Sequence, residues 1–223
     1  MSQPQSQFVR ELEAVVFTGD LVGSTKLAPE AIAEAMRALE TASRLVLDAF
    51  GAGQAPRFTR FRGDGWQCRG PRPQFCLRAA LILRAHLGAL GRSFDTRLSI
   101  GVGAGILDPD APTLDGATGP AFEISGRGLD KMAHAPRFAL GWETPPEGAR
   151  LIQAIFGLAD EISRNWTPAQ ARVFAAALGP RQRPSQEALA RDLDITQQVV
   201  ARHLAGGGDW ALREALQALE DGA

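Results

Sequence analysis

The stretch AVVFTGDLVGSTKL, residues 14–27, joins an apolar run to a carboxylate. Residues 14–18 have the composition of a buried strand. Asp20 comes next, and small and polar residues lead into a helical periodicity that predicts a helix over residues 29–50. The carboxylate of Asp20 is therefore either a cap for that helix or a ligand.

The pattern continues outward from this stretch with alternating strand and helix signals. It predicts a β-hairpin around residues 63–65, a helix over 73–91, a strand over 95–107, a helix over 121–133 and a strand over 137–142. The resulting order is β-α-β-β-α-β-α-β. Hairpins mixed with crossover helices are typical of an α+β fold, a ferredoxin-like sandwich with a mostly antiparallel sheet.

The remainder of the chain has helical patterns only. A helix over 147–165 leads to a second at 166–179, and two short helices with Ser185 and Thr196 as N-caps follow. Two such helices joined by a three-residue turn indicate a helix-turn-helix. We therefore expect a domain over 10–145, a linker helix over 146–166 and a small all-α domain over 167–223.

Composition limits the function classes. The 223 residues carry a formal net charge of −1, so the whole chain is not a basic nucleic-acid binder. Two cysteines without a Cys/His cluster exclude a disulfide scaffold and a structural zinc site, and free thiols are expected. The polar N-terminus predicts no signal peptide, and no apolar run of about 18 residues predicts a membrane span. A cytoplasmic protein with no membrane partner is expected.

A second carboxylate belongs to the hairpin. Asp64 lies between two glycines and is either a type I′ turn residue or a ligand. In such a sheet the end of the first strand and the hairpin lie side by side, and two carboxylates there need a cation. Mg²⁺ or Mn²⁺ with phosphate groups is expected. The segment containing Gly23, Ser24 and Thr25 offers backbone N–H groups for phosphate, although no Walker A motif is present.

Four motifs then follow one another in order: VVFTGDLVGSTKL, RFRGDGWQ, TRLSIGVGAG and GPAFEISGRGL. Together they resemble the class III nucleotide cyclase catalytic domain over residues 13–142. The nearest resemblance is to a divergent relative, the SatD-like family, whose members often end in a helix-turn-helix.

The resemblance implies roles for individual residues. Asp20, Asp64 and the Leu21 carbonyl match the metal ligands, Arg127 matches the arginine that stabilises the transition state, and Arg60 stands where cyclases carry a purine-selecting lysine. Glu123 replaces the asparagine that positions the ribose, which puts cyclisation in doubt but not nucleotide binding. The resemblance also implies a head-to-tail homodimer.

The helix-turn-helix pattern suggests DNA as a partner. Its second helix places Thr196, Gln197, Gln198 and Arg202 toward bases and phosphates. Residues 181–223 carry five arginines and seven acids, so a helical bundle for protein packing is the alternative.

Three functions follow. The first is a transcription regulator that binds a metal–nucleotide ligand and DNA. The second is an active cyclase that makes a 3′,5′-cyclic nucleotide. The third is an inert structural module.

Overall fold

The computed structural model describes residues 9–221, apart from residues 56, 62, 109 and 133–135. The described residues form a mixed α+β structure with a five-stranded sheet and eight α-helices. Its elements are β1 (Val9–Leu21), α1 (Pro29–Phe50), β2 (Phe58–Phe61), β3 (Gly65–Arg69), α2 (Cys76–Gly88), β4 (Thr96–Leu107), α3 (Pro120–Asp130), β5 (Phe138–Trp142), α4 (Ala149–Arg164), α5 (Pro168–Leu178), α6 (Gln186–Leu193), α7 (Gln197–Gly206) and α8 (Asp209–Asp221).

The sheet has the strand order β2-β3-β1-β4-β5. Strand β1 pairs antiparallel with β3 and β4, β2 pairs antiparallel with β3, and only β4 and β5 are parallel. The predicted order of elements and the mostly antiparallel sheet are confirmed. Strand β1 is longer than predicted, because its backbone still pairs at Asp20 with Gly65 and at Leu21 with Thr96.

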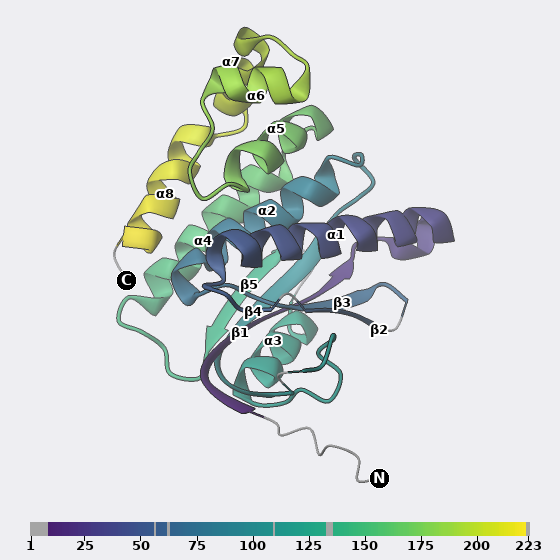
Figure 1. The fold of residues 1–223 in the computed structure, drawn as a ribbon, viewed down its shortest axis with the longest axis vertical. Coiled ribbons are helices and arrows are strands. Elements are labelled where there is room, and N and C mark those ends of the chain that lie inside the picture. The colour runs from purple at the N-terminus through teal and green to yellow at the C-terminus, as the bar shows by residue number, and fades with distance from the viewer. Residues whose placement is uncertain (1–8, 56, 62, 109, 133–135, 222–223) are drawn as a thin grey trace.

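The two faces of the sheet carry different helices (Figure 1). Along β1, Val15 and Phe17 belong to the large core beneath α1 and α2, whereas Ala14 and Val16 pack against Ala121 of α3. This alternation is the period of two that a strand imposes on its side chains. Asp20 has the parity of Ala14 and Val16, so it lies on the α3 side.

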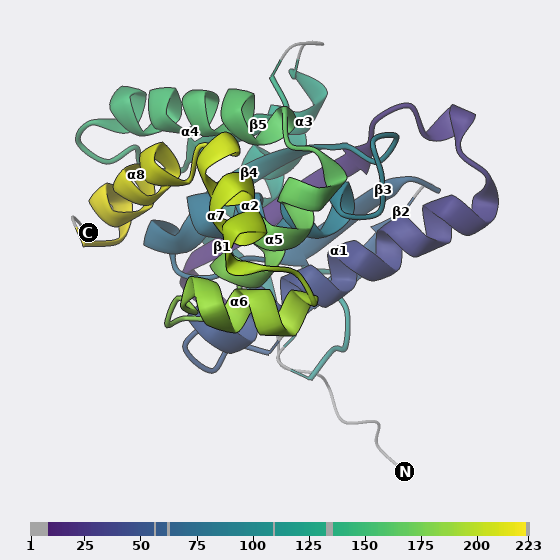
Figure 2. The same ribbon diagram turned by 90° about the horizontal axis from the view of Figure 1, so that it is seen from above.

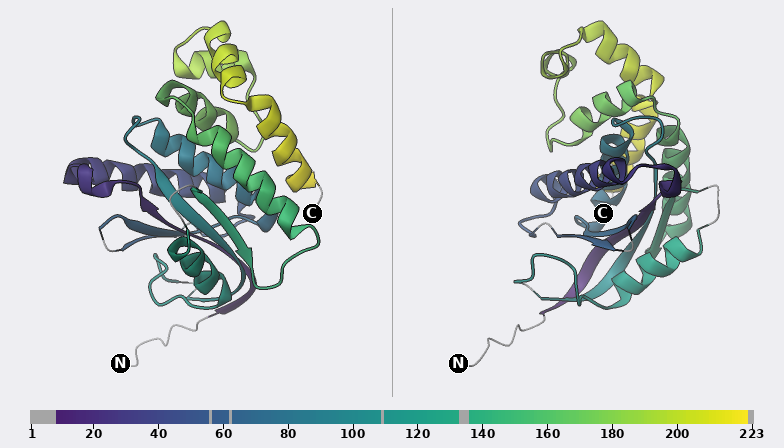
Figure 3. Two further views of the ribbon diagram at one scale, coloured as in Figure 1. Left: turned by 180° about the vertical axis from the view of Figure 1, so that it is seen from behind. Right: turned by 90° about the vertical axis from the view of Figure 1, so that its right-hand side faces the viewer.

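Helix α2 is the centre of the molecule. Most of its side chains are buried, as expected for a helix that is apolar on all sides. Helix α4 lies beside α2 and contacts β5, where Gln153 Nε2 donates to the Leu140 carbonyl. Helices α5 to α7 lie beyond α2 on the side away from the sheet, and α8 runs back alongside α4 (Figures 2 and 3). One cluster of buried apolar side chains runs from the sheet through α2 into α5, α7 and α8, and includes Phe17, Leu83, Phe174, Val200 and Leu212. The expected linker helix, α4, buries Phe156 and Ala159 in the same cluster.

Both cysteines are free, as expected, and both are buried. Burial raises the pKa of the Cys68 and Cys76 thiols, so neither is a reactive nucleophile at neutral pH. Within the described residues, no helix combines the length and the apolar character that crossing a membrane requires.

Candidate functional site

Asp20 lies within β1, between a residue of β3 and a residue of β4. Its register partners are Gly65 on one side and Arg97 on the other. The residue at the N-cap of α1 is Ala28, which forms no side-chain cap bond. Asp20 is therefore not a helix cap, and that alternative is wrong.

The carboxylate of Asp20 is held by a two-point ion pair. Arg97 Nε donates to Asp20 Oδ1 over 2.9 Å, and Arg97 Nη2 contacts Asp20 Oδ2. The hydrogen bond that Arg97 donates to Asp20 raises the pKa of Arg97, and the nearby charge of Asp64 adds to this. The pair is partly open to solvent, since 33% of the Arg97 side chain and 23% of the Asp20 side chain are exposed. Arg97 was not among the predicted site residues, although it opens the TRLSIGVGAG motif after its threonine.

Asp64 lies beside this pair, at the tip of the hairpin. Its carbonyl accepts from Leu21 N over 3.2 Å, and its Oδ2 accepts from Ser24 Oγ over 2.5 Å. Gly63 has a φ of 79°, but Asp64 is not among the described non-glycine residues with positive φ. A type I′ turn needs positive φ at both central positions, so that alternative for Asp64 is wrong.

A buried layer under the two carboxylates fixes their backbone. The Thr96 hydroxyl donates to the Asp20 carbonyl over 2.7 Å and accepts from Trp66 Nε1 over 3.1 Å. A Cβ on Gly19 would lie 2.4 Å from the Trp66 ring, so the glycine of the TGD motif is required by this indole. Trp66 is fully buried, so β1 and β3 cannot separate near Asp20 without exposing the core.

The predicted phosphate segment is an exposed turn. Gly23 has a φ of 65°, in the left-handed region that favours glycine, and Ser24–Lys26 forms a short 3-10 helix. Gly23 and Thr25 are exposed, and Ser24 is half-buried through its contact with Asp64. Of the three predicted phosphate-binding residues, Ser24 is the one that contacts a carboxylate of the site within the described part of the chain.

The donor set fits Mg²⁺ or Mn²⁺ only in part. One or two carboxylates together with substrate phosphates are the usual protein ligands of Mg²⁺. Among the described residues, no group of three or more His, Cys, Asp or Glu side chains could hold a metal ion. The ligands of a bound cation would be Asp20, Asp64 and the carbonyl of the buried Leu21. The cation would have to displace Arg97 from the Asp20 carboxylate.

Among the described residues, Arg60, Glu123 and Arg127 form no hydrogen bond or ion pair with the two aspartates. Arg60 donates through Nε and Nη2 to the Gly63 carbonyl, over 2.9 and 2.7 Å, and so braces the hairpin. Glu123 and Arg127 form an exposed pair at 3.6 Å on α3. Within the described residues, Arg127 has no hydrogen bond or ion pair with Asp20 or Asp64.

The second candidate interface is formed by α6 and α7. Ser185 accepts from Ala188 N and Thr196 accepts from Val199 N, so both predicted N-caps are confirmed. Asp194 ends α6 in the left-handed conformation, with a φ of 54°. The predicted DNA-reading residues are exposed: Thr196, Gln197, Gln198 and Arg202. Helix α7 buries its opposite side through Val200 and Leu204.

Two further arginines near this interface already have partners. Arg183 Nη2 donates to Asp209 Oδ1 over 2.7 Å, and Arg191 lies 3.8 Å from Glu187. These pairs reduce the positive charge that α6 and its flanks offer to a polyanion.

No known family model matches the chain, and no curated protein matches it. Three solved structures of guanylyl cyclases are similar to 56% of the chain. The first is the guanylyl cyclase Cya2, with 14% sequence identity, 73% of its chain covered and a TM-score of 0.41. The second is the catalytic core of a rhodopsin-guanylyl cyclase with converted specificity in complex with ATPalphaS, with 13% identity, 75% of its chain covered and a TM-score of 0.42. The third is the monomeric guanylyl cyclase domain of a RhoGC fusion protein from the aquatic fungus Blastocladiella emersonii, with 11% identity, 78% of its chain covered and a TM-score of 0.38.

Proposed function

We propose that this chain binds a nucleoside triphosphate together with a divalent cation at the end of β1. The observation that carries the proposal is the pair of acidic residues at adjoining strand ends, where the Leu21 amide donates to the Asp64 carbonyl and Arg97 holds Asp20. The exposed turn at Gly23 lies next to this pair in the chain and has room for phosphate oxygens. A bound cation supplies charge neutralisation between the carboxylates and the phosphates.

The chain's own residues set the state of the site before a ligand arrives. Arg97 balances Asp20, and the Ser24 hydroxyl donates to Asp64, so neither carboxylate is left without a donor. A charged donor and acceptor pair of this kind contributes about 1.5–3 kcal/mol. Arg97 therefore competes with a cation for Asp20 and keeps the site closed to weakly bound metals.

The position of Arg127 favours nucleotide binding without cyclisation in a single chain. If Arg127 acts on a nucleotide, it does so from a second copy, as in the homodimer that the motif resemblance implies. Its pair with Glu123 holds the guanidinium beside an acid on the same helix. We therefore propose that a single chain binds the nucleotide without converting it. Cyclisation requires a partner chain to supply Arg127.

We expect binding of a triphosphate to depend on metal and on Asp64. In calorimetric titrations with a non-hydrolysable nucleotide and Mg²⁺, Asp64→Asn should weaken binding about tenfold, because one charged ligand is lost. Arg97→Gln should strengthen metal binding about tenfold, because it removes the competing cation from Asp20.

The matched control is Asp48→Asn, an exposed aspartate on α1 that is expected to leave the affinity unchanged. Binding that is equally tight with a chelator present, or that ignores Asp64→Asn, would contradict the proposal. If the wild-type chain forms a 3′,5′-cyclic product and Arg127→Ala does not, the chain is an active cyclase and does more than bind the nucleotide.

A second candidate function is DNA binding by α7. The specific observation in its favour is the exposed, capped start of α7, with Gln197 and Gln198 beside the turn and Val200 buried behind them. Glutamine can pair bidentately with adenine in the major groove. This interface would make the nucleotide site part of a transcription regulator.

Gel shifts with a pool of double-stranded fragments test this second function. Gln197→Ala should reduce the preference for the selected sequence about tenfold, because a good bidentate contact is worth about 1–3 kcal/mol. Gln186→Ala, an exposed glutamine at the start of α6, is the matched control and should have no such effect. Binding that is absent at about 50 mM salt, where phosphate contacts are strongest, would exclude this function.

A further inference from the structure

A small polar cavity lies where the sheet layer meets the C-terminal helices. Its volume is about 210 Å³, and its lining includes Arg84, Arg92, Asp95, Arg164, Asn165 and Trp166. These residues come from α2, from the α2–β4 loop, and from the end of α4 and the residues that follow it. The cavity is separate from the Asp20–Asp64 site, and none of the predicted site residues lines it.

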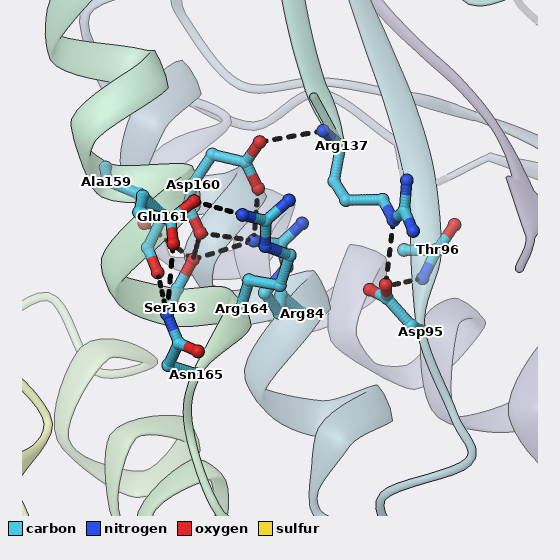
Figure 4. Close-up of polar contacts among 10 residues, drawn as sticks. All are labelled: Arg84, Asp95, Thr96, Arg137, Ala159, Asp160, Glu161, Ser163, Arg164 and Asn165. Carbon is cyan, nitrogen blue, oxygen red and sulfur yellow. Dashed lines mark hydrogen bonds and ion pairs between the residues drawn. The ribbon is translucent and has the colours of Figure 1, made fainter. Parts of the chain in front are cut away.

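Arg84 is the unusual residue of this cavity (Figure 4). Only 6% of its side chain is exposed, and its Nη1 donates to Asp160 Oδ1 over 2.6 Å and to Ser163 Oγ over 2.9 Å. Its guanidinium carbon lies 3.9 Å from the centre of the Phe138 ring. The buried Nε and Nη2 have no hydrogen-bond partner among the described residues. Buried donors of a charged group are rarely left in this state without a reason.

The surrounding charges leave the cavity positive. Asp160 pairs with Arg84, Asp95 with Arg137 at 2.9 Å, and Glu161 with Arg164. Arg92 lines the same cavity, is exposed, and has no ion pair or hydrogen bond within the described residues. The three pairs cancel, so Arg92 adds one uncompensated positive charge.

The burial of Arg84 also favours an anion in this cavity. Burial lowers the pKa of Arg84, while the charges of Asp160 and Asp95 oppose that effect. Burial therefore disfavours the charged form of Arg84 even though Asp160 pairs with it. An anion in the adjoining cavity would add to the compensating charge of Asp160 and would also meet Arg92.

We propose that this cavity is a binding site for a phosphate-class oxyanion, which Arg92 contacts and which the buried charge of Arg84 attracts. A tetrahedral oxyanion fits a polar cavity of about 210 Å³ and accepts several charged hydrogen bonds at once. A free phosphate ion and a phosphate group on a larger molecule share this chemistry.

The location gives the bound anion a structural consequence. Trp166, in the cavity wall, stacks on Phe174 of α5 with ring centres 4.2 Å apart, and its Nε1 donates to the Gly207 carbonyl at the end of α7 over 2.8 Å. An anion that joins α2 to the segment after α4 therefore stiffens the support of the helix-turn-helix segment.

Inorganic phosphate is the first probe, added to the full chain at constant ionic strength with NaCl as the balancing salt. We expect the thermal midpoint to rise with phosphate concentration, and Arg92→Gln to weaken the apparent affinity about tenfold, the usual loss for one charged contact. Arg92 is exposed and has no ion pair or hydrogen bond in the described part of the chain, so this substitution leaves the fold intact. Arg37→Gln, an exposed arginine on α1, is the matched control and should leave the affinity unchanged.

A nucleotide with a terminal phosphate distinguishes the two sources of the group. If the nucleotide binds this cavity, Arg92→Gln weakens it as much as it weakens free phosphate; if it binds only near Asp64, Asp64→Asn weakens it and Arg92→Gln does not. Equal stabilisation of the wild type and Arg92→Gln by phosphate would overturn the proposal. So would the absence of any phosphate effect, or a crystal with tungstate in which the anion lies only at residues 23–25.

Discussion

Replacement of Asp160 by alanine should lower the free energy of unfolding by about 3–5 kcal/mol. Asp160 Oδ1 accepts from Arg84 Nη1, and its Oδ2 accepts from the backbone N–H of Arg137 over 2.7 Å. The substitution leaves the buried Arg84 cation without its partner, and this uncompensated charge is the main cost. Urea denaturation at neutral pH measures the loss.

The adjacent residue supplies the control. Glu161→Ala removes the partner of Arg164 from an exposed pair, in which 63% of the Glu161 side chain is open to solvent. Such pairs contribute about 0–1 kcal/mol. The double variant Arg84→Met/Asp160→Leu should recover most of the stability lost in Asp160→Ala, because it removes both buried charges. Equal losses in Asp160→Ala and Glu161→Ala would refute the buried-charge explanation.

Gly101→Ala should cost about 3 kcal/mol, the upper part of the usual range for overpacking. A Cβ at this position of β4 would lie 2.0 Å from the Ala121 carbonyl and 2.8 Å from the Ser125 amide of α3. Both atoms belong to the backbone, so the helix as a whole has to move away from the sheet. Thermal or urea unfolding measures the change.

Gly126→Ala, in the same helix α3, is the matched control. A Cβ on Gly126 meets nothing within 4 Å, so the substitution should stabilise the chain by about 0.5–1 kcal/mol. A destabilisation of similar size in both variants would show that α3 tolerates no alanine and that the contact at Gly101 is not the cause.

The sequence carried a signal for this contact. Glycines alternate at 101, 103 and 105 in TRLSIGVGAG, which predicts one side of a strand without side chains. That pattern does not say which element approaches. The structure shows that Gly101 is covered by the backbone of α3, which lies on the opposite face of the sheet from α1 and α2.

The sequence predicted the acidic residues of the candidate site but not all of their contacts. Asp20 and Asp64 stand out as acids at the end of a strand and the tip of a hairpin, and the sheet brings those two positions next to each other. Arg97 was missed because its role depends on the register between β1 and β4, 77 positions apart in sequence. A shift of that register by one residue would turn Arg97 to the other face.

The sequence by itself determined the order of helices and strands, the caps of α6 and α7, and the acids of the site. These features rest on local periodicity and on backbone bonds made within a few residues. Only the tertiary structure decided that Arg97 holds Asp20, that Arg127 pairs with its neighbour Glu123, and that Arg84 keeps unused donors beside a cavity. The partners of Arg97 and Arg84 are 77 and 76 residues away, and no local pattern records which distant acid a cation meets when the layers close around it.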